Sequence, residues 1–240
     1  MTLPVFLVPP DRLVGDTVRL DGPESRHANV RRLRPGEQVL VTDGVGGVAR
    51  CAVTVAAGAE IDASVVERRH EPPPCPRIVV AQALAKGGRG ELAVELMTEV
   101  GVDEILPWRA ARCVVEWRGE RGDKALAGWR TTAREASKQA RRAWLPAIAE
   151  PCTTRELADR VHASRLGVVL SEAARTPLTA VPHVPPDGEI VVVVGPEGGL
   201  TDDELAALGP AYRLGPTVLR TSTAGAVAAA LLLSRTPRWH

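Results

Sequence analysis

The chain has 240 residues, of which 45% are hydrophobic and 25% charged, with a net charge of +1, a balance typical of soluble globular proteins with one large or two smaller domains. No apolar run reaches the ~18 residues that a membrane span needs, and the N-terminal segment lacks the features of a secretory signal. The four cysteines include no Cys-x-x-Cys pair, so we expect neither a zinc site nor a disulfide framework. Together these features predict a cytoplasmic protein without a metal or a membrane partner.

Residues 1–70 are predicted to form a small β-barrel-like domain. Strands are expected at Val5–Val8, Gln38–Thr42, Val48–Val55 and Glu60–Glu67. Asp43-Gly44 is typical of a hairpin turn, and only the segment Glu24–Leu33 has a helical pattern. The proline-rich residues 71–76 cannot continue a helix or a central strand, so they are predicted to be a linker.

Residues 77–240 alternate between predicted strands and predicted helices. The strands are expected at Ile78–Leu84, Glu104–Trp108, Pro146–Ala149, Leu166–Ser171, Ile190–Val194 and Tyr212–Leu214. The helices are expected at Glu91–Val100, 122–143, Thr153–His162, Thr201–Leu208 and Thr221–Ser234. Such alternation predicts a second, α/β domain with a parallel sheet and helices on both faces.

A basic zone lies within this second region. Residues 109–142 hold ten Lys and Arg against four acids, whereas residues 143–240 hold eight basic and ten acidic residues. Clustered basic charge on a near-neutral protein is the footprint of a polyanionic partner such as RNA. A solvated helix face explains such a run equally well.

One nucleotide-binding motif is excluded by its context. Gly44–Ala49 match the loose glycine fingerprint of dinucleotide-binding proteins, but the strand-like residues Arg50–Val55 follow instead of a helix. No helix N-terminus is therefore available for a pyrophosphate, and a nicotinamide-dependent dehydrogenase is disfavoured.

Two glycine turns about twenty residues apart distinguish the C-terminal part of the chain. The strand Ile190–Val194 leads into residues 195–199 (GPEGG), and a second turn follows at 214–216 (LGP), before an apolar helix. Glycines allow backbone to approach a ligand closely, so the two turns can enclose a flat molecule.

Acidic residues surround the helix that follows the first turn. Thr201 and Glu204 form a capping box, and Glu197, Asp202 and Asp203 add negative charge at this helix N-terminus. The charge disfavours an anionic ligand and favours a cationic one without phosphate, such as S-adenosylmethionine. An ordinary helix start with an acidic first turn is the competing interpretation.

The tandem of glycine turns resembles the cofactor-binding end of the SPOUT RNA methyltransferases, most closely the ribosomal RNA small subunit methyltransferase E family. The resemblance covers nearly the whole chain. Its other segments are His27–Arg34 with Gly36-Glu37 and Asp43-Gly44, similar to the family's PUA-like RNA-binding domain, then Lys86-Gly87, Glu95-Leu96, Glu99–Val102, Glu135–Arg142 with Pro146, and Leu170–Glu172. The chain departs from the family at Ser222, where an acidic residue commonly follows Arg-Thr.

This resemblance implies a fold and a reaction. It implies an N-terminal PUA-like β-barrel domain and a C-terminal SPOUT α/β domain with a trefoil knot, in a homodimer whose active site uses both subunits. It implies S-adenosylmethionine as the cofactor and N3-methylation of one uridine in the decoding region of 16S ribosomal RNA in the small subunit. A ribose 2′-O-methyltransferase of the same fold and a non-catalytic RNA-binding factor stay open as alternatives.

Candidate site residues follow from the two turns and the basic segments. We expect cofactor contacts from Leu170, Gly195, Glu197, Gly198, Gly199, Leu214, Gly215, Leu219 and Thr221. Uridine N3 must lose its proton, so Arg220 is predicted to stabilise the negative charge, while Glu197 and Glu172 are candidate bases or contacts of the cofactor's ammonium. We expect phosphate contacts from Arg26, His27, Arg31, Arg32, Arg34, Lys138, Arg141 and Arg142.

Overall fold

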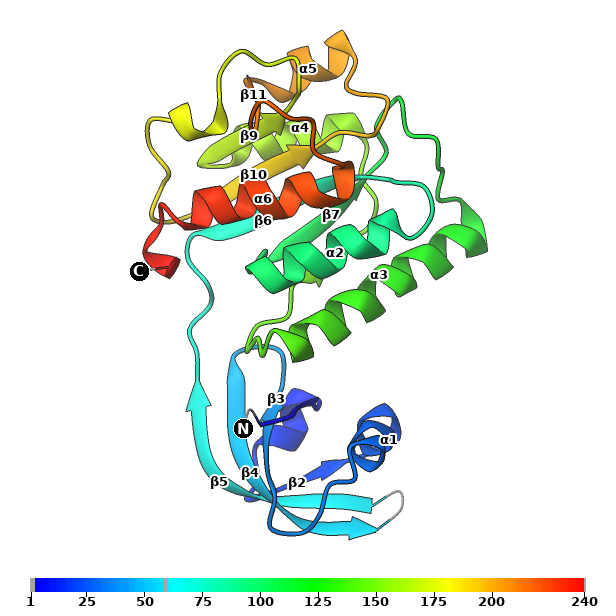
Figure 1. The fold of residues 1–240 in the computed structure, drawn as a ribbon, viewed down its shortest axis with the longest axis vertical. Helices are drawn as coiled ribbons and strands as arrows, with labels where there is room; N and C mark the ends of the chain where they lie inside the picture. The colour runs from blue at the N-terminus through cyan, green and yellow to red at the C-terminus, as the bar shows by residue number, and fades with distance from the viewer. Residues whose placement is uncertain (1–2, 58–59, 240) are drawn as a thin grey trace. The chain divides into compact units, whose positions relative to one another are not determined.

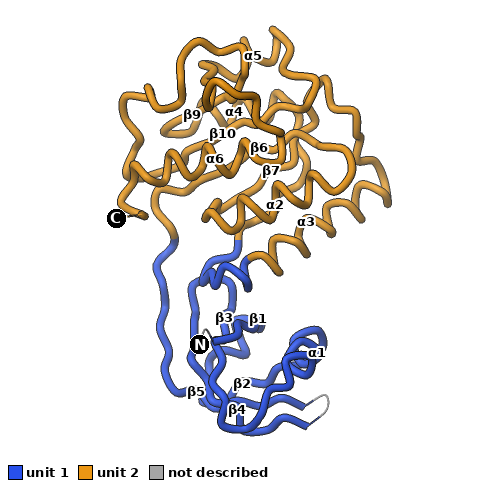
Figure 2. Tube along the Cα trace, in the orientation of Figure 1, with its two compact units in different colours: residues 1–73, 137–145 blue, residues 74–136, 146–240 orange. Residues whose placement is uncertain are grey.

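The computed structural model describes residues 3–57 and 60–239. The chain divides into two compact units, one of residues 1–73 with 137–145 and one of residues 74–136 with 146–240 (Figure 2). The boundary at 73/74 falls within the predicted linker 71–76, and the main difference from the sequence prediction lies elsewhere. Residues 137–145 belong to the first unit, although the sequence pattern assigns all of 77–240 to the second domain.

The first unit is built around a five-stranded sheet. Its elements are β1 (Val5–Leu7), a short 3-10 helix (Pro10–Leu13), β2 (Thr17–Leu20), α1 (Gly22–Val30), β3 (Gln38–Thr42), β4 (Gly47–Ala57) and β5 (Glu60–His70). The strand order is β1-β3-β4-β5-β2, with β1 parallel to β3 and the other pairs antiparallel. Apolar side chains of these strands and of α1 form one buried core. The four predicted strands and the predicted helix correspond to β1, β3, β4, β5 and α1 and are confirmed.

The segment 137–145 joins the first unit through long-range hydrogen bonds to the β3–β4 turn. The Gly46 N–H donates to the Ala143 carbonyl, and the Leu145 N–H donates to the Gly44 carbonyl. The indole of Trp144 donates to the Glu71 carbonyl at 2.9 Å. These bonds explain why residues 137–145 belong to the first unit, although the residues before and after them in the sequence belong to the second.

The second unit contains a six-stranded, fully parallel sheet. Its strands are β6 (Arg77–Ala83), β7 (Glu104–Trp108), β8 (Ala147–Ile148), β9 (Leu166–Leu170), β10 (Glu189–Val194) and β11 (Ala211–Tyr212), in the order β11-β9-β10-β6-β7-β8. Its helices are α2 (Arg89–Val100), α3 (Gly119–Gln139), α4 (Thr154–Ala163), α5 (Asp202–Leu208) and α6 (Thr221–Leu233), with short 3-10 turns at Leu178–Ala180 and Pro237–Trp239. The predicted parallel α/β architecture is confirmed.

Two apolar layers hold the helices of the second unit against its sheet. One buried cluster joins α2, α3 and α6 to one face, and another joins α4 and α5 to the opposite face (Figure 1). The central strand β10 is buried on both faces, which is why its sequence is a continuous run of valines. Because all strands are parallel, the loops that leave β6, β9, β10 and β11 emerge at the same edge.

A buried charge network fastens the other edge of this sheet. Glu104, at the start of β7, accepts hydrogen bonds from Arg77 at 2.6 Å and from both terminal nitrogens of Arg160 at 2.6 and 2.8 Å. Arg160 on α4 also donates to Glu189, at the start of β10. Burial opposes ionisation of Glu104 and is the largest single influence on it. The hydrogen bonds from Arg160 and the positive charges of Arg160 and Arg77 together outweigh burial and hold the pKa of Glu104 below its ordinary value of 4.5.

Removing Arg160 tests this network. Arg160→Met leaves Glu104 buried with fewer cationic partners, so we expect the free energy of unfolding at pH 7, from urea denaturation, to fall by about 3 kcal/mol. Because the folded-state pKa of Glu104 is depressed, this contribution is present above pH 4.5 and is lost as the pH falls through the folded-state value. The matched variant Arg165→Met removes an exposed pair with Asp187 and should cost less than about 1 kcal/mol. Equal losses would contradict the role of the network.

A second buried ion pair lies in the first unit and gives a separate prediction. Lys138 and Glu24 meet at 3.2 Å, with 7% and 5% of their side chains exposed. Lys138→Met deprives the buried Glu24 carboxylate of this partner, so we expect a loss of about 3 kcal/mol in unfolding free energy. The double variant Lys138→Met/Glu24→Met should lose less than Lys138→Met alone. Wild-type stability of Lys138→Met would mean that the ammonium is a surface group.

Candidate functional site

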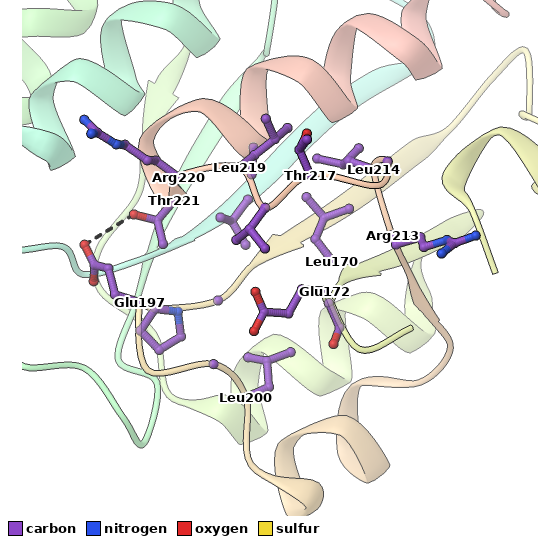
Figure 3. Close-up of a pocket in the computed structure, with 18 of the residues that line it drawn as sticks. Leu170, Glu172, Glu197, Leu200, Arg213, Leu214, Thr217, Leu219, Arg220 and Thr221 are labelled. Carbon is purple, nitrogen blue, oxygen red and sulfur yellow. Dashed lines mark hydrogen bonds between the residues drawn. The ribbon is translucent and has the colours of Figure 1, made fainter. Parts of the chain in front are cut away.

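A cavity of about 340 Å³ lies in the second unit, at the edge of the sheet where β9, β10 and β11 end. Most of its lining comes from three chain segments, namely residues 170–172 at the end of β9, residues 194–197 with 199–200 after β10, and residues 212–221 from β11 to the start of α6; Arg89 and Ala224 complete the lining. Figure 3 shows side chains from all three segments turned toward one space. Both glycine turns singled out in the sequence therefore lie at one site.

The first glycine turn is shaped by close approaches that need glycine. Gly199 has φ +73°, a left-handed conformation, and its N–H donates to the Pro196 carbonyl at 3.0 Å. At Gly195 an added Cβ would lie 2.9 Å from the side chain of Leu200. A larger residue at either position would deform the cavity wall.

The helix after this turn is anchored by its predicted capping box and by one contact from outside. Thr201 and Glu204 make both hydrogen bonds of the box, which confirms that prediction. The buried Glu204 carboxylate also accepts from the Ala111 N–H at 2.7 Å, and Arg112 donates to the carbonyls of Gly198 and Leu200. Residues 111 and 112 therefore stabilise the first glycine turn and the start of α5 through these hydrogen bonds. The sequence pattern did not indicate this role.

One part of the cavity is apolar. Leu170 at the end of β9 is buried, and Leu214 and Leu219 of the second turn are partly buried against the core of the unit. Figure 3 shows these three leucines around the same side of the space. Such a surface suits the faces of a planar ring.

Another part of the cavity is charged. The Glu197 carboxylate pairs with Arg89 at 3.1 Å. It also accepts a long hydrogen bond of 3.5 Å from the Thr221 hydroxyl (Figure 3). The Glu172 carboxylate points into the space between the loops, whereas the guanidinium groups of Arg213 and Arg220 are directed away from it. The cavity therefore offers two carboxylates beside an apolar wall.

The predicted cofactor residues gather at this cavity with one exception. Its lining includes Leu170, Gly195, Glu197, Gly199, Leu214, Gly215, Leu219 and Thr221, together with Glu172 and Arg220. Gly198 lies outside the lining, because its carbonyl bonds to Arg112 and its Cβ position would be 3.1 Å from the Arg112 side chain.

Sequence reasoning missed several lining residues. They are Arg89, Ser171, Val194, Pro196, Leu200, Tyr212, Arg213, Pro216, Thr217, Val218 and Ala224. Most of them are neighbours of predicted residues. Arg89 is distant in sequence, and the signal that could have found it is topological: it follows β6, which pairs in parallel with β10, so both strands end at the same edge.

The predicted RNA-binding residues all lie in the first unit. Arg26, Arg31, Arg32 and Arg34 are exposed on α1 and the turn after it, and Arg141 is exposed as well. His27 is half-buried, with its ring 5.1 Å from that of Phe6.

One of these predicted contacts needs correction, and another belongs to a partly buried side chain. Lys138 is buried and ion-paired with Glu24, so its ammonium does not lie on a surface that phosphate could reach. Arg142 is half-buried and donates to the Trp144 carbonyl at 2.9 Å. The Lys138–Glu24 pair joins the segment 137–145 to α1, whereas the bond from Arg142 lies within that segment.

Residues 3–57 and 60–239 contain neither a metal-binding group nor a helix that could span a membrane. Within these ranges no group of three or more His, Cys, Asp or Glu is arranged to hold a metal ion. The helices that the structure describes include none with the length and apolar character needed to cross a membrane.

Comparison with known proteins finds two family models along the chain, and the second of them also spans residues 137–145. Residues 71–233 match the model of an RNA methyltransferase domain, and residues 20–66 match that of an RNA methyltransferase PUA domain. The chain is 45% identical to the ribosomal RNA small subunit methyltransferase E of Mycobacterium bovis, over 94% of this chain and 89% of the relative. It is 30% identical to the protein of the same name from Bacillus subtilis, over 87% of this chain and 86% of the relative.

A solved structure shows the same fold. The crystal structure of a ribosomal RNA small subunit methyltransferase E from Neisseria gonorrhoeae, bound to S-adenosyl methionine, has a TM-score of 0.86 and 30% identity, and the match covers 97% of this chain and 98% of that one. The first unit is thus a PUA-like domain and the second a SPOUT-type RNA methyltransferase domain, and the chain belongs to the ribosomal RNA small subunit methyltransferase E family.

Proposed function

We propose that this protein transfers a methyl group from S-adenosylmethionine to N3 of one uridine in the decoding region of 16S ribosomal RNA in the small subunit. The observation that carries the proposal is the cavity between the two glycine turns, which joins an apolar wall to a pair of carboxylates. Relatives of the same family name support the RNA substrate.

The residues of the cavity fit S-adenosylmethionine. A volume of about 340 Å³ is in the range of small-molecule sites. Leu170, Leu214 and Leu219 would pack against the adenine ring, and the carboxylates suit a ligand that is cationic. The acidic first turn of α5, Asp202 to Glu204, disfavours a phosphate-bearing cofactor at this helix start.

The chemistry asks little of the protein beyond positioning and proton removal. The cofactor supplies a methyl group on a sulfonium, a leaving group that needs no further activation. Holding the nucleophile in line with this methyl group can contribute up to about 7–11 kcal/mol. Uridine N3 must also lose its proton, and the resulting charge spreads over O2 and O4 of the base.

We assign these tasks to three side chains. Glu172, whose carboxylate points into the cavity, would accept the N3 proton. Glu197 is held by Arg89 and Thr221, and this arrangement favours a binding role over proton transfer. Arg220 is exposed at the start of α6 with its guanidinium directed away from the cavity, so its side chain would have to turn toward the cavity to stabilise the uracil oxygens O2 and O4, which flank N3.

We also propose the trefoil knot and the homodimer that the family resemblance implies. For the knot, the connection between β9 and β10 pairs in parallel with the chain between β11 and α6: the Leu178 N–H donates to the Arg213 carbonyl, and the Arg213 N–H donates to the Thr176 carbonyl. The same connection is tied to the end of α6, because Arg235 donates to the Val181 carbonyl at 2.7 Å. The homodimer rests on the family resemblance alone.

Methylation mapping tests the function directly. Small ribosomal subunits from cells lacking this activity would be incubated with the protein and S-adenosylmethionine, and the modified nucleoside identified by mass spectrometry. We expect 3-methyluridine at one position of the 16S RNA. A 2′-O-methyl nucleoside would replace the proposal with the ribose methyltransferase, and RNA binding without methylation would replace it with a non-catalytic factor.

Two matched glycine variants connect this activity to the cavity. Gly215 lines the cavity, its φ is not in the left-handed region, and an added Cβ meets nothing within 4 Å. Gly215→Trp should therefore fold but fill the cofactor space and abolish methylation. Gly15→Trp makes the same change in the first unit, where the nearest atom to an added Cβ is 3.9 Å away, and should keep wild-type activity. Full activity of Gly215→Trp would argue against this cavity.

The exposed arginines of the first unit give a prediction about RNA binding. Arg31→Ala/Arg34→Ala removes two exposed cations near α1, so the slope of log affinity against log salt should decrease by about 1.5 if each contacts one phosphate. The measurement is the affinity for unmodified small subunits between roughly 50 and 200 mM salt, a range over which phosphate contacts weaken binding strongly. The charge-matched control Arg155→Ala/Arg165→Ala in the second unit should leave the slope unchanged. The reverse pattern would place the RNA on the other unit.

A further inference from the structure

The charged wall of the cavity brings together three segments that are distant in sequence. Arg89 begins α2 after β6, Glu197 lies in the first glycine turn after β10, and Thr221 begins α6. Arg89 and Glu197 pair at 3.1 Å. The Thr221 hydroxyl lies 3.5 Å from the same carboxylate oxygen, as Figure 3 shows. All three line the cavity whose other wall consists of leucines.

An ion pair facing a ligand cavity is complementary to a ligand that carries both charges on neighbouring atoms. The methionine end of S-adenosylmethionine is such a group, with an ammonium and a carboxylate on one carbon. A carboxylate accepts hydrogen bonds from an ammonium, and a guanidinium donates two parallel bonds to a carboxylate. The Arg89–Glu197 pair presents both partners side by side.

We propose that Arg89 and Glu197 form the subsite for the amino-acid end of the cofactor, with Arg89 contacting its carboxylate and Glu197 its ammonium. This inference rests on the proposed function, because it takes S-adenosylmethionine as the ligand of the cavity. Arg89 and Glu197 have 51% and 36% of their side chains exposed, so the pair is accessible. When the ligand binds, Arg89 and Glu197 would exchange each other for the ligand's carboxylate and ammonium. This exchange breaks only their weak, solvent-screened contact with each other.

The other arginines near the cavity are less suited to this role. Arg112 donates to the carbonyls of Gly198 and Leu200 behind the first turn. Arg213 and Arg220 line the cavity, but their guanidinium groups are directed away from it. Arg89 differs from them because it already contacts a carboxylate of the cavity.

Three ligands separate the parts of this subsite by calorimetric titration. S-adenosylmethionine carries both charges of the amino-acid end, its decarboxylated form keeps the ammonium, and 5′-methylthioadenosine lacks the whole end. We expect wild type to bind S-adenosylmethionine about 10-fold or more tighter than the decarboxylated form, since hydrogen bonds to charged groups have this magnitude. In Arg89→Met this ratio should fall to about 1, while affinity for 5′-methylthioadenosine should stay within about 2-fold of wild type.

Retained binding of 5′-methylthioadenosine also shows that the variant is folded. The matched control is Arg213→Met, the same change at another arginine of the cavity lining, which should keep the wild-type ratio. Arg89→Lys keeps a cation without the paired donors and should give an intermediate ratio.

Three results would overturn the inference. If Arg89→Met weakens S-adenosylmethionine and its decarboxylated form equally, Arg89 only positions Glu197. If Arg213→Met removes the discrimination instead, the carboxylate lies at the other end of the cavity. If wild type binds none of the three ligands, the proposed function fails and this subsite fails with it, a result distinct from the first two.

Discussion

The functional part of this protein depends on the parallel pairing of β10 with β9 and β6. Val191 to Val194 are buried and pair with both neighbours, so the ends of the three strands are fixed relative to one another. Each strand end opens into a segment of the cavity: residues 170–172, the first glycine turn, and the turn that carries Arg89. The cavity is thus a consequence of strand register. The glycines contribute because they allow the backbone of the loops to turn tightly and to pack closely at that edge.

The two edges of the same sheet have different tasks. At the edge where the strands begin, Glu104, Glu189, Arg77 and Arg160 satisfy one another, and this network ties three strands to α4. At the edge where they end, Glu172 and the half-exposed Glu197–Arg89 pair face a cavity. At the first edge a buried Glu104 carboxylate is paired with several cationic groups, while charges that line a cavity lie at the other edge, as in other open α/β sheets that bind ligands beyond the carboxyl ends of their strands.

Local patterns predicted most of the fold, whereas contacts between distant segments were not predictable from them. The valine run of β10 and the Thr201–Glu204 capping box are local signals, and both have the expected structure. The four-residue β2 was missed because only Val18 and Leu20 are apolar in it, too few to show alternation. The packing of residues 137–145 with the first unit depends on bonds to Gly44 and Gly46, about a hundred residues earlier, so the burial of Lys138 could not be read from its basic neighbours. At the site, the glycine turns identified one wall, but Arg89 and Arg112 become visible only when the sheet order is known.

A crystal structure of the protein with S-adenosylmethionine tests the central claim, that the strand ends of this sheet and the two glycine turns form the cofactor site. The account predicts the adenine ring against Leu170, Leu214 and Leu219, and the methionine end beside Glu197. Cofactor bound elsewhere on the protein, with the space between the two turns occupied only by solvent, would contradict it.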